Sequence, residues 1–229
     1  TIALDTTTNA FTGAVTITTN DNSGTDADVT IDGGTTALVL AASTIDGDLT
    51  VTSGNASGIT DSGTVTVGGN LAATTDANNG LINLGTLAVD GTVQLTTNGS
   101  GNATVVNDAG LNFAASTVGG NLAATATTGN MTDSGALAIT GTTTLTTSAN
   151  NATIALDTTT NAFTGAVTIT TNDDSGTDAH VYIDGGTTAL VIATSTIDGD
   201  LELASGHASG ITDSGTVTVG GNLAATTYA

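Results

Sequence analysis

The chain contains no lysine, arginine, cysteine, proline or tryptophan, and most of these absences exclude something. Without lysine or arginine the protein cannot neutralise phosphates, which excludes nucleic acids and anionic membrane surfaces as partners of this segment. Without cysteine there is no disulfide framework and no indication of the redox compartment. No apolar run approaches the roughly 20 residues that a membrane-spanning helix needs.

What is present favours an ordered, all-β protein. Threonine supplies 54 of the 229 residues and glycine 31, and both are weak helix formers. Threonine and valine fit well on the pleated surface of a sheet. Hydrophobic residues make up 38% of the chain, which gives it a core to bury despite a net charge of −21.

A long internal repeat organises the sequence. Residues 1–77 and 153–229 align without a gap, with Thr1 opposite Thr153, and they show ten differences. We therefore expect one continuous structure over residues 1–229, made of a complete repeat unit (1–152) and a partial second copy (153–229). Such a pattern is typical of a segment taken from a longer repeat array. The ten differences are Asn22/Asp174, Asp28/His180, Thr30/Tyr182, Leu40/Ile192, Ala42/Thr194, Thr50/Glu202, Val51/Leu203, Thr52/Ala204, Asn55/His207 and Asp76/Tyr228.

A shorter period lies inside the unit. Its mark is a glycine followed by alternating apolar residues, and six such motifs fill one unit. The motif glycines are Gly13, Gly47, Gly69, Gly91, Gly120, Gly141, Gly165, Gly199 and Gly221. Alternation predicts strands with one buried face, and about 22 residues hold only two or three short strands. This suits one turn of a parallel β-helix (a β-solenoid) with coils of about 22–25 residues, and predicts nine turns.

The stretch "ITDSGTVTVGGNLAATT", which occurs twice without change, shows the expected coil most clearly. Residues of one parity are apolar and should point inward, while threonines point outward. The predicted inward residues of the first occurrence are Ile59, Val65, Val67, Leu71 and Ala73.

Two long glycine spacings, from Gly13 to Gly47 and from Gly165 to Gly199, enclose an acidic segment, "TNDNSGTDADVTIDGGTTA" and its copy "TNDDSGTDAHVYIDGGTTA". We interpret the surplus as a longer acidic loop, or small β-excursion, in two coils. Clustered carboxylates are ligands for hard cations, so Ca²⁺ is the candidate ligand and no other cofactor is required. A solvated, Asp-rich turn is the alternative. The candidate ligands are Asp21, Asp26, Asp28, Asp32, Asp173, Asp174, Asp178 and Asp184.

A second acidic pattern lies before the glycine of "DSG"-like stretches. If these residues stack from coil to coil, adjacent carboxylates would repel each other. The alternative is an Asx turn, in which each side chain caps local backbone amides. The positions are Asp61, Asn83, Asp108, Asp133 and Asp213, with Asp157 a further candidate.

The stretch "GDLTVTSGNASGITDSGTVTVGGNLAATT" resembles the repeats of filamentous haemagglutinin-type adhesins, which are giant bacterial surface proteins. The resemblance extends over essentially the whole chain. It implies a right-handed parallel β-helix, secretion across the outer membrane and display as a long fibre at the cell surface. The secretion domain and the receptor-binding tripeptide of such proteins have no counterpart in this sequence.

We therefore expect a structural and adhesive segment of an extracellular, bacterial cell-surface fibre, with neighbouring repeats or copies of itself, other cells or matrix as partners. A solenoid that binds ice or another surface through threonine ladders is the main alternative. Enzyme activity on polysaccharides is not expected, since no lysine or arginine is present to stabilise an oxyanion and no catalytic residue is assigned. Differences between the copies, such as His180, Tyr182 and Glu202, mark the expected contact surface.

Overall fold

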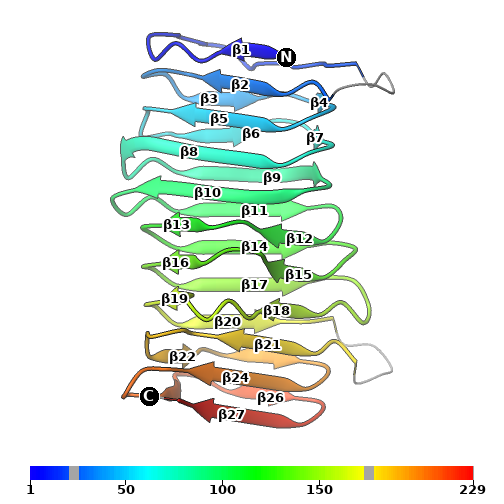
Figure 1. Ribbon diagram of the computed structural model, residues 1–229, viewed down its shortest axis with the longest axis vertical. Coiled ribbons are helices and arrows are strands. Elements are labelled where there is room, and N and C mark those ends of the chain that lie inside the picture. Colours follow the sequence, from blue (N-terminus) through cyan, green and yellow to red (C-terminus); the bar gives the residue numbers. More distant parts are fainter. Residues whose placement is uncertain (21–25, 173–177, 229) are drawn as a thin grey trace.

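The computed structural model describes residues 1–20, 26–172 and 178–228, and these residues form 27 strands and no helix. The paired strands all run parallel, each against a strand of the turn before or after it. Figure 1 shows the turns stacked as the chain descends from the N-terminus. The strands in front run to the left and those behind to the right, so the coil is right-handed. The predicted parallel β-solenoid is confirmed.

Two sheets form the walls of the solenoid. The first sheet contains β1 (Ile2–Leu4), β2 (Val29–Asp32), β5 (Leu49–Ser53), β8 (Leu71–Asn78), β10 (Thr92–Asn98), β12 (Leu111–Phe113), β13 (Ser116–Val118), β15 (Met131–Asp133), β16 (Leu137–Ile139), β18 (Ile154–Leu156), β19 (Ala162–Phe163), β21 (Val181–Asp184), β24 (Leu201–Ser205) and β27 (Leu223–Thr227). The second contains β3 (Leu38–Leu40), β4 (Ser43–Ile45), β6 (Ile59–Asp61), β7 (Val65–Val67), β9 (Ile82–Val89), β11 (Ala103–Asn107), β14 (Leu122–Ala126), β17 (Thr143–Thr147), β20 (Val167–Thr170), β22 (Leu190–Ile192), β23 (Ser195–Ile197), β25 (Ile211–Asp213) and β26 (Val217–Val219). Nine turns have strands in both sheets, as predicted, and β1 and β27 flank them.

The core is a set of apolar columns that run along the axis. Leu49 pairs with Leu71 and Leu71 with Val93, in each case one turn further along the chain, and each is at most 1% exposed. Burying each such side chain fully is worth about 1.5–3 kcal/mol. The five predicted inward residues of the opening coil are all buried, at 0–1% exposure.

The glycine motif is explained by a row of side-chain acceptors, which we call the corner ladder. The residue that follows seven of the nine motif glycines, all except Gly13 and Gly165, donates its backbone N–H to a side chain stacked one turn earlier. Asn70 N–H donates to Asp48 Oδ1 (2.7 Å), and Thr92 N–H donates to Asn70 Oδ1 (2.8 Å). A Cβ at Gly69 would lie 2.2 Å from Asp48 Oδ1, so only glycine leaves room for the acceptor. The acceptors of the corner ladder are Asp28, Asp48, Asn70, Asn102, Asn121, His180 and Asp200.

One motif does not equal one turn, which corrects the prediction of six coils per unit. From β2 to its copy β21 the first sheet advances by seven strands, so one repeat unit makes seven turns. The motif strands β5, β8 and β10 lie in the first sheet, β14, β17 and β20 in the second, and β24 and β27 in the first again. Each switch of sheet adds part of a turn and coincides with a long glycine spacing, as between Gly91 and Gly120 or between Gly165 and Gly199.

The acidic segment is correspondingly less of a loop than the sequence suggested. Val29–Asp32 is strand β2 and Leu38–Leu40 is strand β3, and both belong to the walls of the solenoid. The same holds for β21 and β22 in the second copy. Many of the extra residues between the motif glycines therefore belong to strands of the two sheets. The spacing is longer there because the motif strands change from one sheet to the other.

We predict that Gly69→Ala lowers the urea midpoint of unfolding, while Gly13→Ala leaves it nearly unchanged. A Cβ at Gly69 would also lie 2.8 Å from the backbone carbon of Gly47, whereas a Cβ at Gly13 meets nothing within 4 Å. Overpacking of this kind costs about 1–3 kcal/mol. Equal effects at the two positions would show that the glycines serve another purpose.

Candidate functional site

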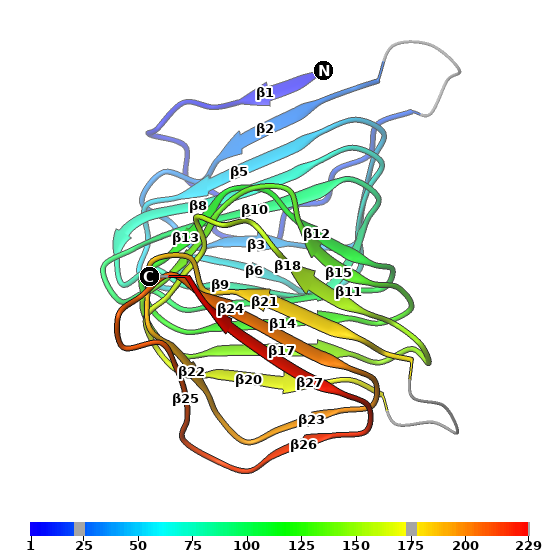
Figure 2. The same cartoon turned by 60° about the horizontal axis from the view of Figure 1, so that its bottom comes forward.

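Three of the copy-specific residues meet at one surface hollow, which we call the Tyr182 hollow. It lies on the first sheet across β18, β21 and β24, which Figure 2 shows side by side at the C-terminal end. The complete chain has two histidines, two tyrosines and one glutamate, and one of each gathers here. The hollow is lined by Thr153, Ile154, Ala155, His180, Val181, Tyr182, Asp200 and Glu202.

The strand register brings these residues together. Tyr182 pairs with Ala155 on one side and with Glu202 on the other, so all three lie in one outward column. The small Ala155 side chain leaves the space beside the tyrosine ring. In the first copy the corresponding column is Ala3, Thr30 and Thr50, which offers neither a ring nor a carboxylate.

His180 forms the edge of the hollow and belongs to the corner ladder. Its Nδ1 accepts a hydrogen bond from Asp200 N–H (2.9 Å), as Asp28 Oδ1 does from Asp48 N–H (3.0 Å) in the first copy. An accepting Nδ1 places the ring proton on Nε2. The contact of 3.9 Å between Nδ1 and Asp200 Oδ2 is therefore not an ion pair in this state. The Asp28/His180 difference exchanges one acceptor for another.

Carboxylates lie close to the Tyr182 ring. Partial burial raises the pKa of Tyr182, and the carboxylates of Asp184, Glu202 and Asp157 raise it further. Nearby carboxylates disfavour a negative charge on the phenol oxygen of Tyr182. No lysine or arginine exists in the chain to balance these carboxylates.

A second tyrosine, Tyr228, contacts Asp184, which lies on the same strand as Tyr182. Tyr228 O–H donates a hydrogen bond to Asp184 Oδ1 (2.7 Å), and Asp184 is only 2% exposed. The same oxygen accepts from Gly186 N–H (2.7 Å). The hydrogen bond to Asp184, with lesser effects of burial and of the Asp184 charge, raises the pKa of Tyr228 to about 12.

The proposed calcium ligands are held separately where they are described. Asp28 and Asp32 accept from the backbone N–H groups of Asp48 and Gly34, and Asp184 is engaged as above. The N–H of Asp178 lies 3.4 Å from Asp198 Oδ2. Among residues 1–20, 26–172 and 178–228 no three acidic or histidine side chains form a metal-binding group, Asp26 included. Asp21, Asp173 and Asp174 lie outside the described residues, so Ca²⁺ binding stays a prediction.

The "DSG" positions form no continuous carboxylate column, although Asp133 and Asp157 lie in adjacent turns and repel each other. Asp61 pairs with Leu40, Asp133 with Phe113 and Asp213 with Ile192, and they belong to different sheets. The alternative of a local Asx turn is also wrong for Asp61. Its carboxylate accepts from the N–H groups of Gly85 (3.0 Å) and Thr86 (2.6 Å), which belong to the next turn.

Asp133 makes a similar link between turns. Its Oδ1 accepts from Asp157 N–H (3.0 Å) and its Oδ2 from Asn161 Nδ2 (2.6 Å). Burial raises the pKa of Asp133 and the Asp157 charge adds to this, against the opposing effect of the hydrogen bonds. Ionised Asp133 therefore costs stability, which falls as the pH rises through the raised pKa.

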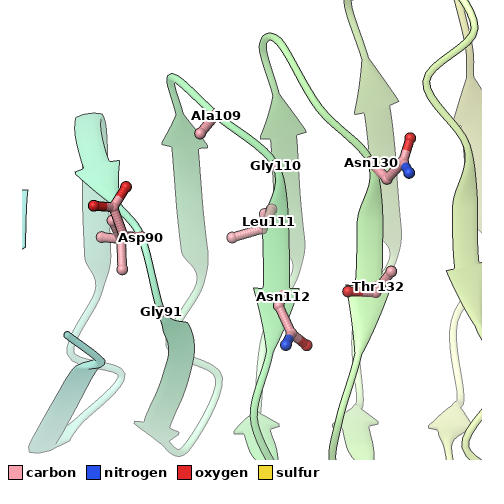
Figure 3. A pocket seen from close by; sticks show the side chains of 9 residues that line it. Asp90, Gly91, Ala109, Gly110, Leu111, Asn112, Asn130 and Thr132 are labelled. Carbon is pink, nitrogen blue, oxygen red and sulfur yellow. The ribbon is translucent and has the colours of Figure 1, made fainter. Parts of the chain in front are cut away.

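A second hollow lies where the motif strands switch sheets (Figure 3). Asp90 and Asn130 stand on either side of it, and the chain passes between them at Gly110 and Leu111. Asn112 Oδ1 is buried there without a hydrogen-bond partner. This amide oxygen can accept a hydrogen bond from water or another small donor, but the hollow offers no ring and no charged group besides Asp90.

Threonine columns are present on the second sheet. Thr125, Thr146, Thr170, Thr196 and Thr218 pair in succession. The column beside it is interrupted, since Ala123 stands between Thr104 and Thr144. Binding of ice or another surface through a threonine array stays an untested alternative.

Comparison with known proteins places the chain in a family. A family described as repeats of unknown function (DUF5649) matches residues 26–82, 100–170 and 178–229. The chain belongs to this family. No curated protein and no solved structure gives a significant match. In the described part of the DUF5649 chain there is no helix suited to crossing a membrane.

The tyrosines give a testable pH dependence. We predict that a spectrophotometric titration at 295 nm shows one tyrosine ionising at about pH 12, and that Tyr228→Phe removes this step. The Tyr228–Asp184 hydrogen bond stabilises the C-terminal turns below pH 10, the ordinary pKa of tyrosine, and is lost as the pH rises through about 12. A step at pH 10 that Tyr228→Phe removes would contradict the bond.

Proposed function

We propose that the chain is a structural and adhesive segment of a long extracellular fibre on a bacterial surface. The observation that carries the proposal is the identical register of the two copies. Val29, Leu49 and Leu71 stack in the first copy, and Val181, Leu201 and Leu223 stack in the same way in the second. Copying the unit therefore extends one rod without a new type of contact.

The joint between the two copies supports a fibre that lengthens by repetition. Met131 of the first unit pairs with Ile154 of the second copy, and Ile154 pairs with Val181, so the stacking passes from one unit to the next without a break. Leu156 at this joint is 0% exposed. Neighbouring repeats or copies of the protein are the proposed partners of the rod.

The similarity to filamentous haemagglutinin-type repeats supports the surface location and the adhesive role. The composition agrees with an exposed location, because the absence of lysine and arginine removes every trypsin site. The Tyr182 hollow supports a place of contact on the otherwise repetitive wall. On this proposal the walls provide stiffness and the copy-specific residues provide recognition.

The proposal predicts that antibodies raised against this segment label intact cells of the source organism. Proteinase K added to intact cells should remove the labelling, since a surface fibre is accessible to it. A cytoplasmic protein detected in the same cells serves as the control for cell integrity. Labelling that requires permeabilised cells would contradict the surface location.

A further inference from the structure

We infer that the Tyr182 hollow binds a cationic side chain, a lysine or arginine, of a partner protein. The inference deepens the proposed function and rests on it for the partner, since it names the chemistry by which the rod would recognise another molecule. Three features of the site support it: a hollow, the Tyr182 ring in its wall, and the carboxylates of Asp200 and Glu202 in the same wall.

The ring and the carboxylates suit one kind of ligand. A cation over the face of an aromatic ring gains about 0.5–1 kcal/mol at exposed sites. Glu202 stands directly beside Tyr182 on the neighbouring strand, and Asp157 and Asp184 act on the same ring. Asp200 Oδ1 accepts a hydrogen bond from the backbone N–H of Asn222 (2.6 Å). Its Oδ2 lies on the side of His180.

Other ligand classes fit less well. An anion would meet a chain of net charge −21 with no lysine or arginine to receive it. A neutral sugar could stack on Tyr182, but it would leave the surrounding carboxylates without a counter-charge. A partner that carries lysine or arginine supplies the charge that this chain lacks.

The duplicated sequence suggests that the hollow is specific to the second copy. Ten residues differ between the copies, and three of them line this hollow. The first copy folds with Asp28, Thr30 and Thr50 at the same positions. Back-substitution to these residues therefore gives variants that the fold accepts, and Tyr182→Thr leaves the net charge unchanged.

The test uses the complete chain and the peptide acetyl-Gly-Gly-Lys-Gly-Gly-amide in 150 mM NaCl, followed by the NMR shifts of the tyrosine rings and of the backbone amides. We expect saturable binding that Tyr182→Thr weakens about two- to fivefold, as the loss of an exposed cation–π contact predicts. Tyr182→Phe should stay within about twofold of the original chain, because it keeps the ring. The single variant Glu202→Thr should also weaken binding, most clearly at low salt, because it removes a carboxylate beside the ring.

The controls separate a site from diffuse attraction. If Tyr182→Thr binds the peptide as the original chain does, only the overall charge acts and the inference is wrong. It is also wrong if the same peptide with glutamine for lysine, or a neutral oligosaccharide, binds equally well. Neither result bears on the surface location, which the antibody experiment tests separately.

A gain of binding completes the test. The double variant T30Y/T50E rebuilds the ring and the carboxylate on the first copy. We expect the peptide to shift the NMR signals of the backbone amides around position 30 in this variant and not in the original chain. If no second site appears, a tyrosine beside a glutamate does not suffice to bind the cation, which contradicts the inference.

Discussion

The structure depends on one constraint, the register of each turn on the turn before it. Parallel backbone hydrogen bonds fix the distance between turns at about 4.8 Å, but by themselves they permit slippage along the strand. Where the corner ladder is present it fixes the register, because the acceptor on one turn reaches one particular N–H of the next. Asp48, Asn70 and Thr92 form such a chain over three turns. The glycine of the motif follows from it at the ladder positions such as Gly69, where a Cβ would occupy the place of the acceptor.

Sequence reasoning predicted the fold because the inward alternation is a local property. Ile59, Val65 and Leu71 are buried as expected. It could not assign a motif to a sheet, because β10 and β14 carry the same pattern on different walls. A signal for these shifts does exist. Ser43, Ser116 and Ser195 each precede a Thr and an apolar residue, and each accepts through Oγ from the backbone N–H of the adjacent turn.

The candidate site was predictable in part. The differences between copies pointed to His180, Tyr182 and Glu202, and these three line one hollow. The sequence could not show that Tyr182 and Glu202 are neighbours, since this needs the pairing of β21 with β24. Nor could it show that Asp61 serves the next turn, because the residues it binds lie 24 and 25 positions later. The hydrogen-bond partners of a polar side chain at a coil corner lie on an adjacent coil, so they can be assigned only once the stacking of the coils is known.

The central claim is that each complete repeat unit adds seven turns to one continuous rod. The most direct test is the length of chains into which one, two and three further units are inserted, measured by small-angle X-ray scattering and electron microscopy. Seven turns predict an increase of about 34 Å for each unit, at about 4.8 Å a turn. An increase of about 29 Å for each unit would mean six turns, and particles that grow in width rather than length would contradict the rod itself.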